Sequence, residues 1–122
     1  MPRHVLAQAD IHPAIRDKIS THHQVVVDEV QAAVAAKDVV VIGMATNPFV
    51  KKARNALSAA GVKHHYLEYG SYLTKWRERN AVKMWSGWPT FPMVFVRGVL
   101  VGGADDVQAL ISSGELQKLL VK

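Results

Sequence analysis

The residues best placed to do chemistry are Asn47-Pro48-Phe49-Val50, which follow a run of β-branched residues from Val39 to Ile42. That run is apolar at every position and too short to cross a membrane, which is typical of a strand buried on both faces. Asn is a preferred helix N-cap, and Pro is well tolerated at the first helical position. The spacing therefore predicts a helix that begins after Asn47 and stops at Gly61. Free amides and the helix dipole at such a start favour an anion.

The chain contains no cysteine, and this absence removes several kinds of chemistry. Thiolate catalysis, disulfides, thiolate zinc sites and cysteine-ligated iron–sulfur clusters all need sulfur that this chain does not supply. Two histidine pairs, His22-His23 and His64-His65, are the remaining candidates for metal ligands. Adjacent side chains point to opposite faces of a strand or diverge on a helix, and further ligands are not visible, so we expect no metal site. No Ser-His-Asp order, P-loop or dinucleotide fingerprint occurs either.

Length and composition predict one compact domain over residues 1–122, in which residues 1–23 form an N-terminal arm or helical extension. Hydrophobic residues make up 49% of the chain and charged residues 20%, which is ordinary for a soluble globular protein. No apolar run approaches the length of a membrane span, and the first ten residues lack a signal-peptide core. We therefore expect a cytoplasmic protein without a membrane partner.

The chain is basic, with a formal net charge of +5 and a pI near 9.7. Basic residues cluster on two segments predicted to be helical, Lys51, Lys52 and Arg54 on the first and Lys75, Arg77, Arg79 and Lys83 on the second. Such clusters are typical of solvated helix faces. No zinc-finger, basic-zipper or RNA-binding aromatic signature accompanies them, so we do not expect a nucleic-acid partner.

The rest of the chain reads as alternating helices and strands. Apolar spacing predicts an amphipathic helix over Gln24 to Ala36, preceded by a helix entry at His12-Pro13. After Gly61 the predicted elements are a strand over Val62–Tyr69, a helix over Ser71–Trp85, strands over Met93–Arg97 and Val99–Val101, and a last helix from Asp105 or Asp106 that Gly114 interrupts. The inner side of the Ser71–Trp85 helix is expected to carry Leu73, Trp76, Asn80 and Met84. The strand–helix–strand unit implies parallel pairing of its strands, and the last two strands imply an antiparallel hairpin.

Three separated motifs give the chain a resemblance to a known family. They are Asn47-Pro48-Phe49-Val50 at the helix start, Trp88-Pro89-Thr90-Phe91-Pro92, and Gly102-Gly103-Ala104-Asp105-Asp106. With the order of strands, these motifs make the chain resemble a glutaredoxin from about Val25 to Leu120. The resemblance implies a thioredoxin-like α/β fold of the glutaredoxin type, with a four-stranded mixed sheet flanked by helices and an extra N-terminal helix. It also implies a family setting in cell redox homeostasis.

The resemblance places Asn47 at the position of the nucleophilic cysteine in the family's Cys-Pro-Tyr-Cys or Cys-Gly-Phe-Ser motif, and Val50 at the resolving position. Thiol–disulfide exchange requires a thiolate, and neither side chain can form one. We therefore predict no thiol–disulfide oxidoreductase activity and assign no catalytic residue.

The resemblance also implies a groove for glutathione. Phe91, before an expected cis Pro92, fits the residue whose backbone pairs with the tripeptide. Ala104 and Asp105 match the positions that receive the γ-glutamyl end, and Arg79 matches a basic position that can meet the glycyl carboxylate. Met44 replaces a further basic residue, which removes a charge-assisted contact. The expected ligand-binding set is Asn47, Phe49, Arg79, Thr90, Phe91, Pro92, Gly103, Ala104 and Asp105.

Three functions are compatible with this pattern. The preferred one is a redox-inactive protein that requires no cofactor and binds glutathione, a γ-glutamyl-like peptide or an extended partner segment with weak or moderate affinity. The second is a protein-interaction module with no small ligand. The third is a glutathione transferase-like enzyme in which Asn47 stabilises a bound thiolate. Structural roles are also possible for four of these residues. Asn47 and Asp105 can act as helix caps, and Trp88 and Phe91 can pack in the core.

Overall fold

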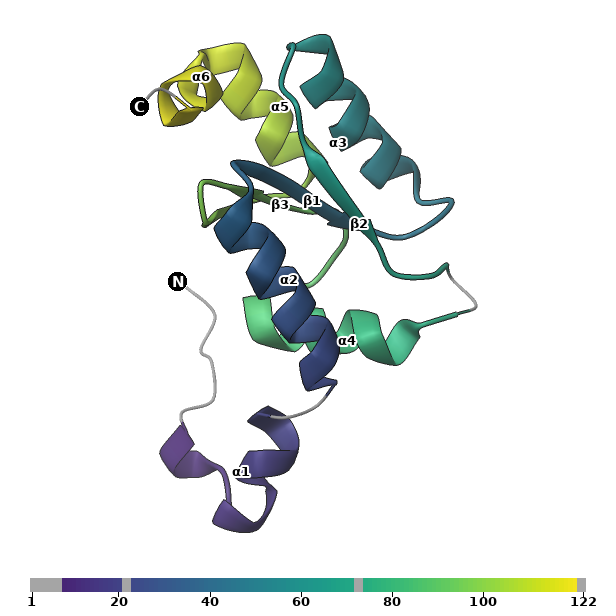
Figure 1. Cartoon of the computed structure of the whole chain (residues 1–122), viewed down its shortest axis with the longest axis vertical. Coiled ribbons are helices and arrows are strands. Elements are labelled where there is room, and N and C mark those ends of the chain that lie inside the picture. The colour runs from purple at the N-terminus through teal and green to yellow at the C-terminus, as the bar shows by residue number, and fades with distance from the viewer. Residues whose placement is uncertain (1–7, 21–22, 72–73, 121–122) are drawn as a thin grey trace.

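The computed structural model of the chain describes residues 8–20, 23–71 and 74–120 (Figure 1). Its centre is a four-stranded sheet with the strand order β2-β1-β3-β4. The strands are β1 (Val39–Gly43), β2 (His65–Glu68), β3 (Met93–Val96) and β4 (Val99–Gly102). β1 pairs parallel with β2 and antiparallel with β3, and β3 pairs antiparallel with β4. The mixed sheet and the terminal hairpin are therefore confirmed.

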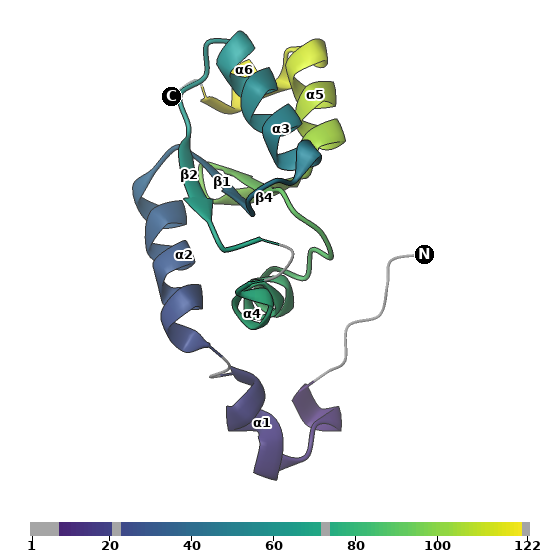
Figure 2. The same ribbon diagram turned by 90° about the vertical axis from the view of Figure 1, so that its right-hand side faces the viewer.

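Helices cover both faces of this sheet (Figure 2). They are α1 (Pro13–Ser20), α2 (Gln24–Ala36), α3 (Pro48–Ala59), α4 (Trp76–Ser86), α5 (Ala104–Ser113) and α6 (Glu115–Leu120), with a short 3-10 helix η1 (Gln8–Asp10) before them. The helices α3 and α5 lie on one face and α2 and α4 on the other, while α1 lies beyond the ends of α2 and α4, away from the sheet. The extra N-terminal helix is thus present.

Strand β1 is buried on both faces, as its unbroken apolar run predicts. Alternate side chains of a strand point to opposite sides of the sheet, so β1 supplies two separate cores. The first core joins β1 to α3, α5 and α6 through Val39, Val41, Leu57, Val107 and Leu116. The second joins it to α2, α4 and β3 through Val40, Ile42, Val30, Val82 and Phe95. One strand therefore ties both helical layers to the sheet.

Helix α3 begins and ends where the sequence predicts. Its last turn closes with two hydrogen bonds, from the amide of Gly61 to the carbonyl of Ser58 at 3.0 Å and from the amide of Val62 to the carbonyl of Leu57 at 2.9 Å. Gly61 has φ +74°, which glycine adopts at little cost, and this pair of bonds is the Schellman ending of a helix.

Two predicted boundaries are wrong. The strand after α3 begins at His65 rather than Val62, because the Val62 amide is already bound to α3 and cannot join the ladder. Helix α4 begins at Trp76 rather than Ser71, because a turn precedes it. In that turn the Ser71 amide donates a hydrogen bond to the Thr74 hydroxyl at 3.0 Å, and the Thr74 amide donates to the Ser71 carbonyl at 3.3 Å. Only then does the helix start, so the loop is longer than the sequence suggested.

The inner face of α4 also differs from the prediction. Trp76 and Met84 are 55% and 52% exposed, whereas Arg79, Ala81 and Val82 are buried. Val82 packs into the second core and Trp85 packs against it, so this side of α4 faces the sheet. Leu73, predicted for the same face, lies outside the described residues.

Candidate functional site

The start of α3 is capped by Asn47. Its Oδ1 accepts hydrogen bonds from the backbone amides of Phe49 at 2.9 Å and Val50 at 3.2 Å. These are two of the four amides that a helix start leaves without a partner in the helix. The side-chain oxygen is therefore used by the helix itself, and the predicted N-cap is confirmed.

Val50, which the resemblance places at the resolving position, belongs to the core. It is 3% exposed and packs against the end of β1 at Gly43. A Cβ on Gly43 would lie 2.6 Å from Cγ1 of Val50, closer than carbon atoms approach without movement. The contact fixes α3 on the sheet, so at this position the chain has a packing residue in place of a reactive one.

Between α3 and α5 lies a groove of about 290 Å³, called here the α3–α5 groove. It brings together residues of the three separated motifs, the first represented by Phe49 alone. Its lining residues are Phe49, Trp88, Thr90, Phe91, Pro92, Gly103, Ala104, Asp105 and Asp106. Seven of these belong to the predicted binding set, and the Phe91-Pro92 peptide bond is cis, as expected. Their role as ligand contacts remains a prediction. Asn47 does not line this groove but borders a second hollow on the other side of α3.

The rim of the α3–α5 groove carries charges from three helices. Lys52 Nζ of α3 lies 2.9 Å from Oδ1 of Asp105, whose side chain is 84% exposed. Asp106 instead serves the helix, because its Oδ2 accepts a hydrogen bond from the Gly103 amide at 3.0 Å. Nζ of Lys83, on α4, lies 5.7 Å from the centre of the Phe91 ring. The sequence placed Lys83 on a basic helix but did not predict its position beside Phe91, because that position depends on how α4 packs.

Arg79 is not at this groove. It is 7% exposed, and its Nη1 donates hydrogen bonds to the carbonyls of Tyr69 at 3.0 Å and Thr74 at 2.5 Å. The side chain thereby ties the loop after β2 to α4. Arg79 is consequently not part of a solvated basic face, and in this arrangement its Nη1 is bonded to two backbone carbonyls.

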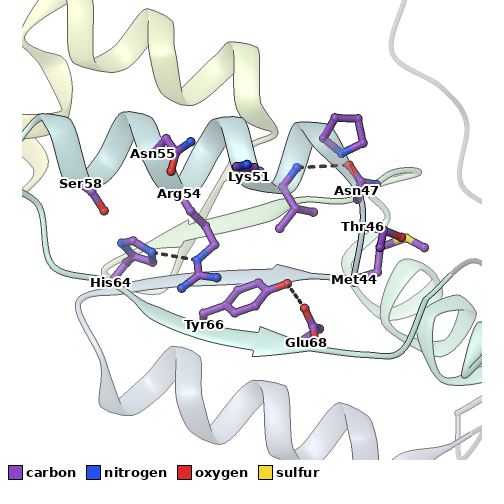
Figure 3. Close-up of a pocket in the computed structure, with 12 residues that line it drawn as sticks. Met44, Thr46, Asn47, Lys51, Arg54, Asn55, Ser58, His64, Tyr66 and Glu68 are labelled. Atoms are coloured by element: carbon purple, nitrogen blue, oxygen red, sulfur yellow. Dashed lines mark hydrogen bonds between the residues drawn. The ribbon is translucent and has the colours of Figure 1, made fainter.

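The larger hollow, of about 600 Å³, lies between α3 and the edge strand β2 and is called here the α3–β2 pocket (Figure 3). Its lining residues are Met44, Thr46, Asn47, Pro48, Val50, Lys51, Arg54, Asn55, Ser58, His64, Tyr66 and Glu68. The guanidinium carbon of Arg54 lies 3.9 Å from the centre of the Tyr66 ring, and its Nε donates to Nε2 of His64 at 3.3 Å. The Tyr66 hydroxyl donates to Glu68 at 2.9 Å. No sequence motif indicated this pocket.

Burial shifts the pKa of two groups in this pocket. Burial lowers the pKa of His64; the Val62 backbone opposes this shift, and the nearby charge of Arg54 adds a smaller lowering. Burial, together with the hydrogen bond to Glu68, raises the pKa of Tyr66 to about 12. At neutral pH His64 is therefore a neutral imidazole that accepts from Arg54, and Tyr66 is a neutral phenol.

Within the described ranges, no helix combines the length and apolar character that crossing a bilayer demands. In the same ranges no three His, Asp or Glu side chains gather closely enough to hold a metal ion. His22, one of the histidines considered from the sequence, lies outside those ranges.

The mixed sheet, with α3 starting beside the cis Phe91-Pro92 turn, defines a thioredoxin-like domain of the glutaredoxin type. The sequence model of the Glutaredoxin family matches residues 39–101. A glutaredoxin-like protein of Dictyostelium discoideum is 44% identical over 102 residues, which cover 84% of this chain and 83% of that protein. The chain belongs to the glutaredoxin family.

Solved structures agree with this assignment. Oxidized glutaredoxin 2 from Chlamydomonas reinhardtii has a TM-score of 0.69 and 33% sequence identity, over 80% of this chain and 92% of that one. The buckwheat glutaredoxin–glutathione complex has a TM-score of 0.70 over 82% of this chain and 91% of that one. Its sequence identity of 20% makes it a likeness of fold alone.

Proposed function

We propose that the chain is a redox-inactive glutaredoxin-like protein that binds glutathione, or a γ-glutamyl-like peptide, in the α3–α5 groove. The observation that carries the proposal is that Phe49 of the first motif meets residues of the other two motifs around this one groove. A cytoplasmic setting in redox homeostasis, with no resident cofactor, forms part of the same proposal. The buckwheat complex supports it only to the extent that a protein of this fold holds glutathione.

Phe91 offers the ligand its backbone. Among the described residues, no hydrogen bond uses the Phe91 amide or carbonyl. An extended peptide can pair with both groups in the manner of an added strand. Phe49 and Trp88 line the same groove and supply its apolar walls.

Charges on the rim suit the two ends of the tripeptide. The exposed Asp105 can receive the α-ammonium group of a γ-glutamyl residue in exchange for Lys52, because a solvent-exposed ion pair is worth only about 0–1 kcal/mol. Lys83 lies beside Phe91 and can meet a carboxylate, a role that neither Met44 nor the buried Arg79 fills. The affinity is therefore expected to be weak or moderate.

Binding is tested by titrating the protein with reduced and oxidised glutathione, using calorimetry and amide NMR spectra. We expect saturable shifts at the Phe91 and Asp105 amides and at least fivefold weaker binding in Asp105→Ala. Glu115→Ala is a matched control, because Glu115 also forms a surface ion pair with a lysine, Lys118, but lies on α6. Absence of heat and of shifts with both forms would remove the proposal.

Redox inactivity has its own test. The unaltered chain should show only background glutathione-dependent disulfide reduction, since it has no sulfur nucleophile. Asn47→Cys would place a single thiol at a helix N-terminus, where its pKa falls. We expect it to form a mixed disulfide with oxidised glutathione at least tenfold faster than Ser112→Cys, an exposed position on α5. Activity in the unaltered chain would refute redox inactivity, and equal rates in the two variants would show that the start of α3 does not activate a thiol at position 47.

A further inference from the structure

The α3–β2 pocket lies on the other side of α3 from the groove. Lys51, Arg54, Asn55 and Ser58 line it and recur at the three- and four-residue spacing of one helix face. Phe49 and Lys52 instead contact the groove and its rim. Figure 3 shows the pocket closed below by His64, Tyr66 and Glu68 of β2 and the loop before it. The two hollows are separate sites that share a helix.

Arg54 is an exposed residue whose side chain is oriented in this pocket by two contacts. Its guanidinium stacks over the Tyr66 ring, and its Nε donates to His64. Among the described residues, no hydrogen bond uses its two terminal amino groups. An arginine with a fixed plane and a free fork is pre-organised for an anion with two or more oxygens, because little side-chain entropy remains to be lost on binding.

The positive charge of Arg54 is not neutralised by a bonded partner. His64 accepts as a neutral imidazole, Tyr66 contributes its ring, and the carboxylate of Glu68 accepts from the Tyr66 hydroxyl. Figure 3 shows Glu68 beyond that hydroxyl, on the side away from His64. Within the described residues neither Arg54 nor Lys51 pairs with a carboxylate. Two cations one helical turn apart therefore face the same hollow.

We propose that the α3–β2 pocket binds the phosphate group of a small phosphate monoester. Such a group carries close to two negative charges at neutral pH and three acceptor oxygens, which match the Arg54 fork and the Lys51 ammonium. A carboxylate has one charge and would leave one of the two cations unmatched. Asn55 and Ser58 line the same face of α3 and can bond to the rest of the ligand. A volume of about 600 Å³ lies within the range of small-molecule sites.

The test is an amide NMR titration of the whole chain at constant ionic strength, with inorganic phosphate, adenosine monophosphate, adenosine and succinate as separate probes. We expect both phosphates to cause saturable shifts at Arg54, Asn55 and His64, with adenosine and succinate inactive. Arg54→Gln should weaken phosphate binding at least tenfold. Arg77→Gln is the matched control, because Arg77 also lies over an aromatic ring, that of Trp76, but on α4.

Several results would overturn the proposal. They are shifts that do not saturate, equal binding of succinate, or equal losses in Arg54→Gln and Arg77→Gln. If Arg54→Gln does not fold, Arg54→Lys keeps the charge without the fork, and unchanged phosphate affinity there would refute the role of the fork. Binding of adenosine monophosphate but not of inorganic phosphate would assign recognition to the nucleoside and also contradict the proposal. Saturating glutathione should leave the Arg54 shifts in place, which keeps this test separate from that of the groove.

Discussion

Replacing Asn47 by alanine should destabilise the protein by about 1 kcal/mol, the usual cost of losing a helix N-cap. The structure gives the reason, because Oδ1 of Asn47 accepts from two amides of α3 that alanine would leave without a protein partner. Unfolding entropy of roughly 2.1 cal/mol/K per residue gives about 0.26 kcal/mol/K for the 122 residues. A loss of about 1 kcal/mol therefore lowers Tm by about 4 °C.

Thermal and urea unfolding, followed by circular dichroism, would measure this change. Asn47→Asp keeps the acceptor oxygen and adds a charge that suits the helix dipole, so we expect Tm to stay level or rise. Asn55→Ala, a change of the same type in the interior of α3, should raise Tm slightly, since alanine has the better helix propensity. The reasoning is refuted if Asn47→Ala unfolds like the unaltered protein, or if Asn47→Asp is as damaging as alanine.

Three further predictions concern packing, titration and surface charge. Gly43→Ala should cost about 1–3 kcal/mol through overpacking, and Val50→Ala in the same chain should recover part of that loss in a double-mutant cycle measured by urea unfolding. Burial lowers the pKa of His64, so the unfolded chain binds more protons as pH falls below 6.5. Stability should therefore decrease over that window, and the slope should be smaller in His64→Gln; an unchanged slope would contradict the assignment. Lys52→Ala should change the unfolding free energy by less than about 1 kcal/mol, and less still in high salt, because its partner Asp105 is exposed.

Local signals explain which parts of the fold could be predicted from the sequence. The limits of α3 depend on Asn47, Pro48 and Gly61, whose preferences act within a few residues of chain. The buried character of β1 is equally visible, because every position in it is apolar. The α3–α5 groove could be anticipated for a different reason. Each of its three motifs is a short contiguous stretch of sequence, so the resemblance to the family can be seen without knowing how the chain folds.

The features that were missed depend on contacts between distant elements. The side chain of Arg79 is held away from the groove by hydrogen bonds to the carbonyls of Tyr69 and Thr74, and the sequence does not reveal the path of the loop that carries them. The α3–β2 pocket is lined by residues of α3 and β2 that meet only in the folded chain, as Arg54 and Tyr66 do, and no periodicity of the sequence links the two elements. From the sequence alone, Lys51 and Arg54 are typical of a solvated helix face. Only the position of β2 shows that both residues line a pocket.

Because α3 forms a wall of both hollows, a displacement of this helix would alter the two together. Val50 packs the first turn of α3 against the end of β1 at Gly43, and close packing of this kind opposes displacement. The two hollows are therefore expected to bind their ligands independently. If a ligand did displace α3, thermodynamic linkage would require each ligand to change the affinity for the other by the same factor.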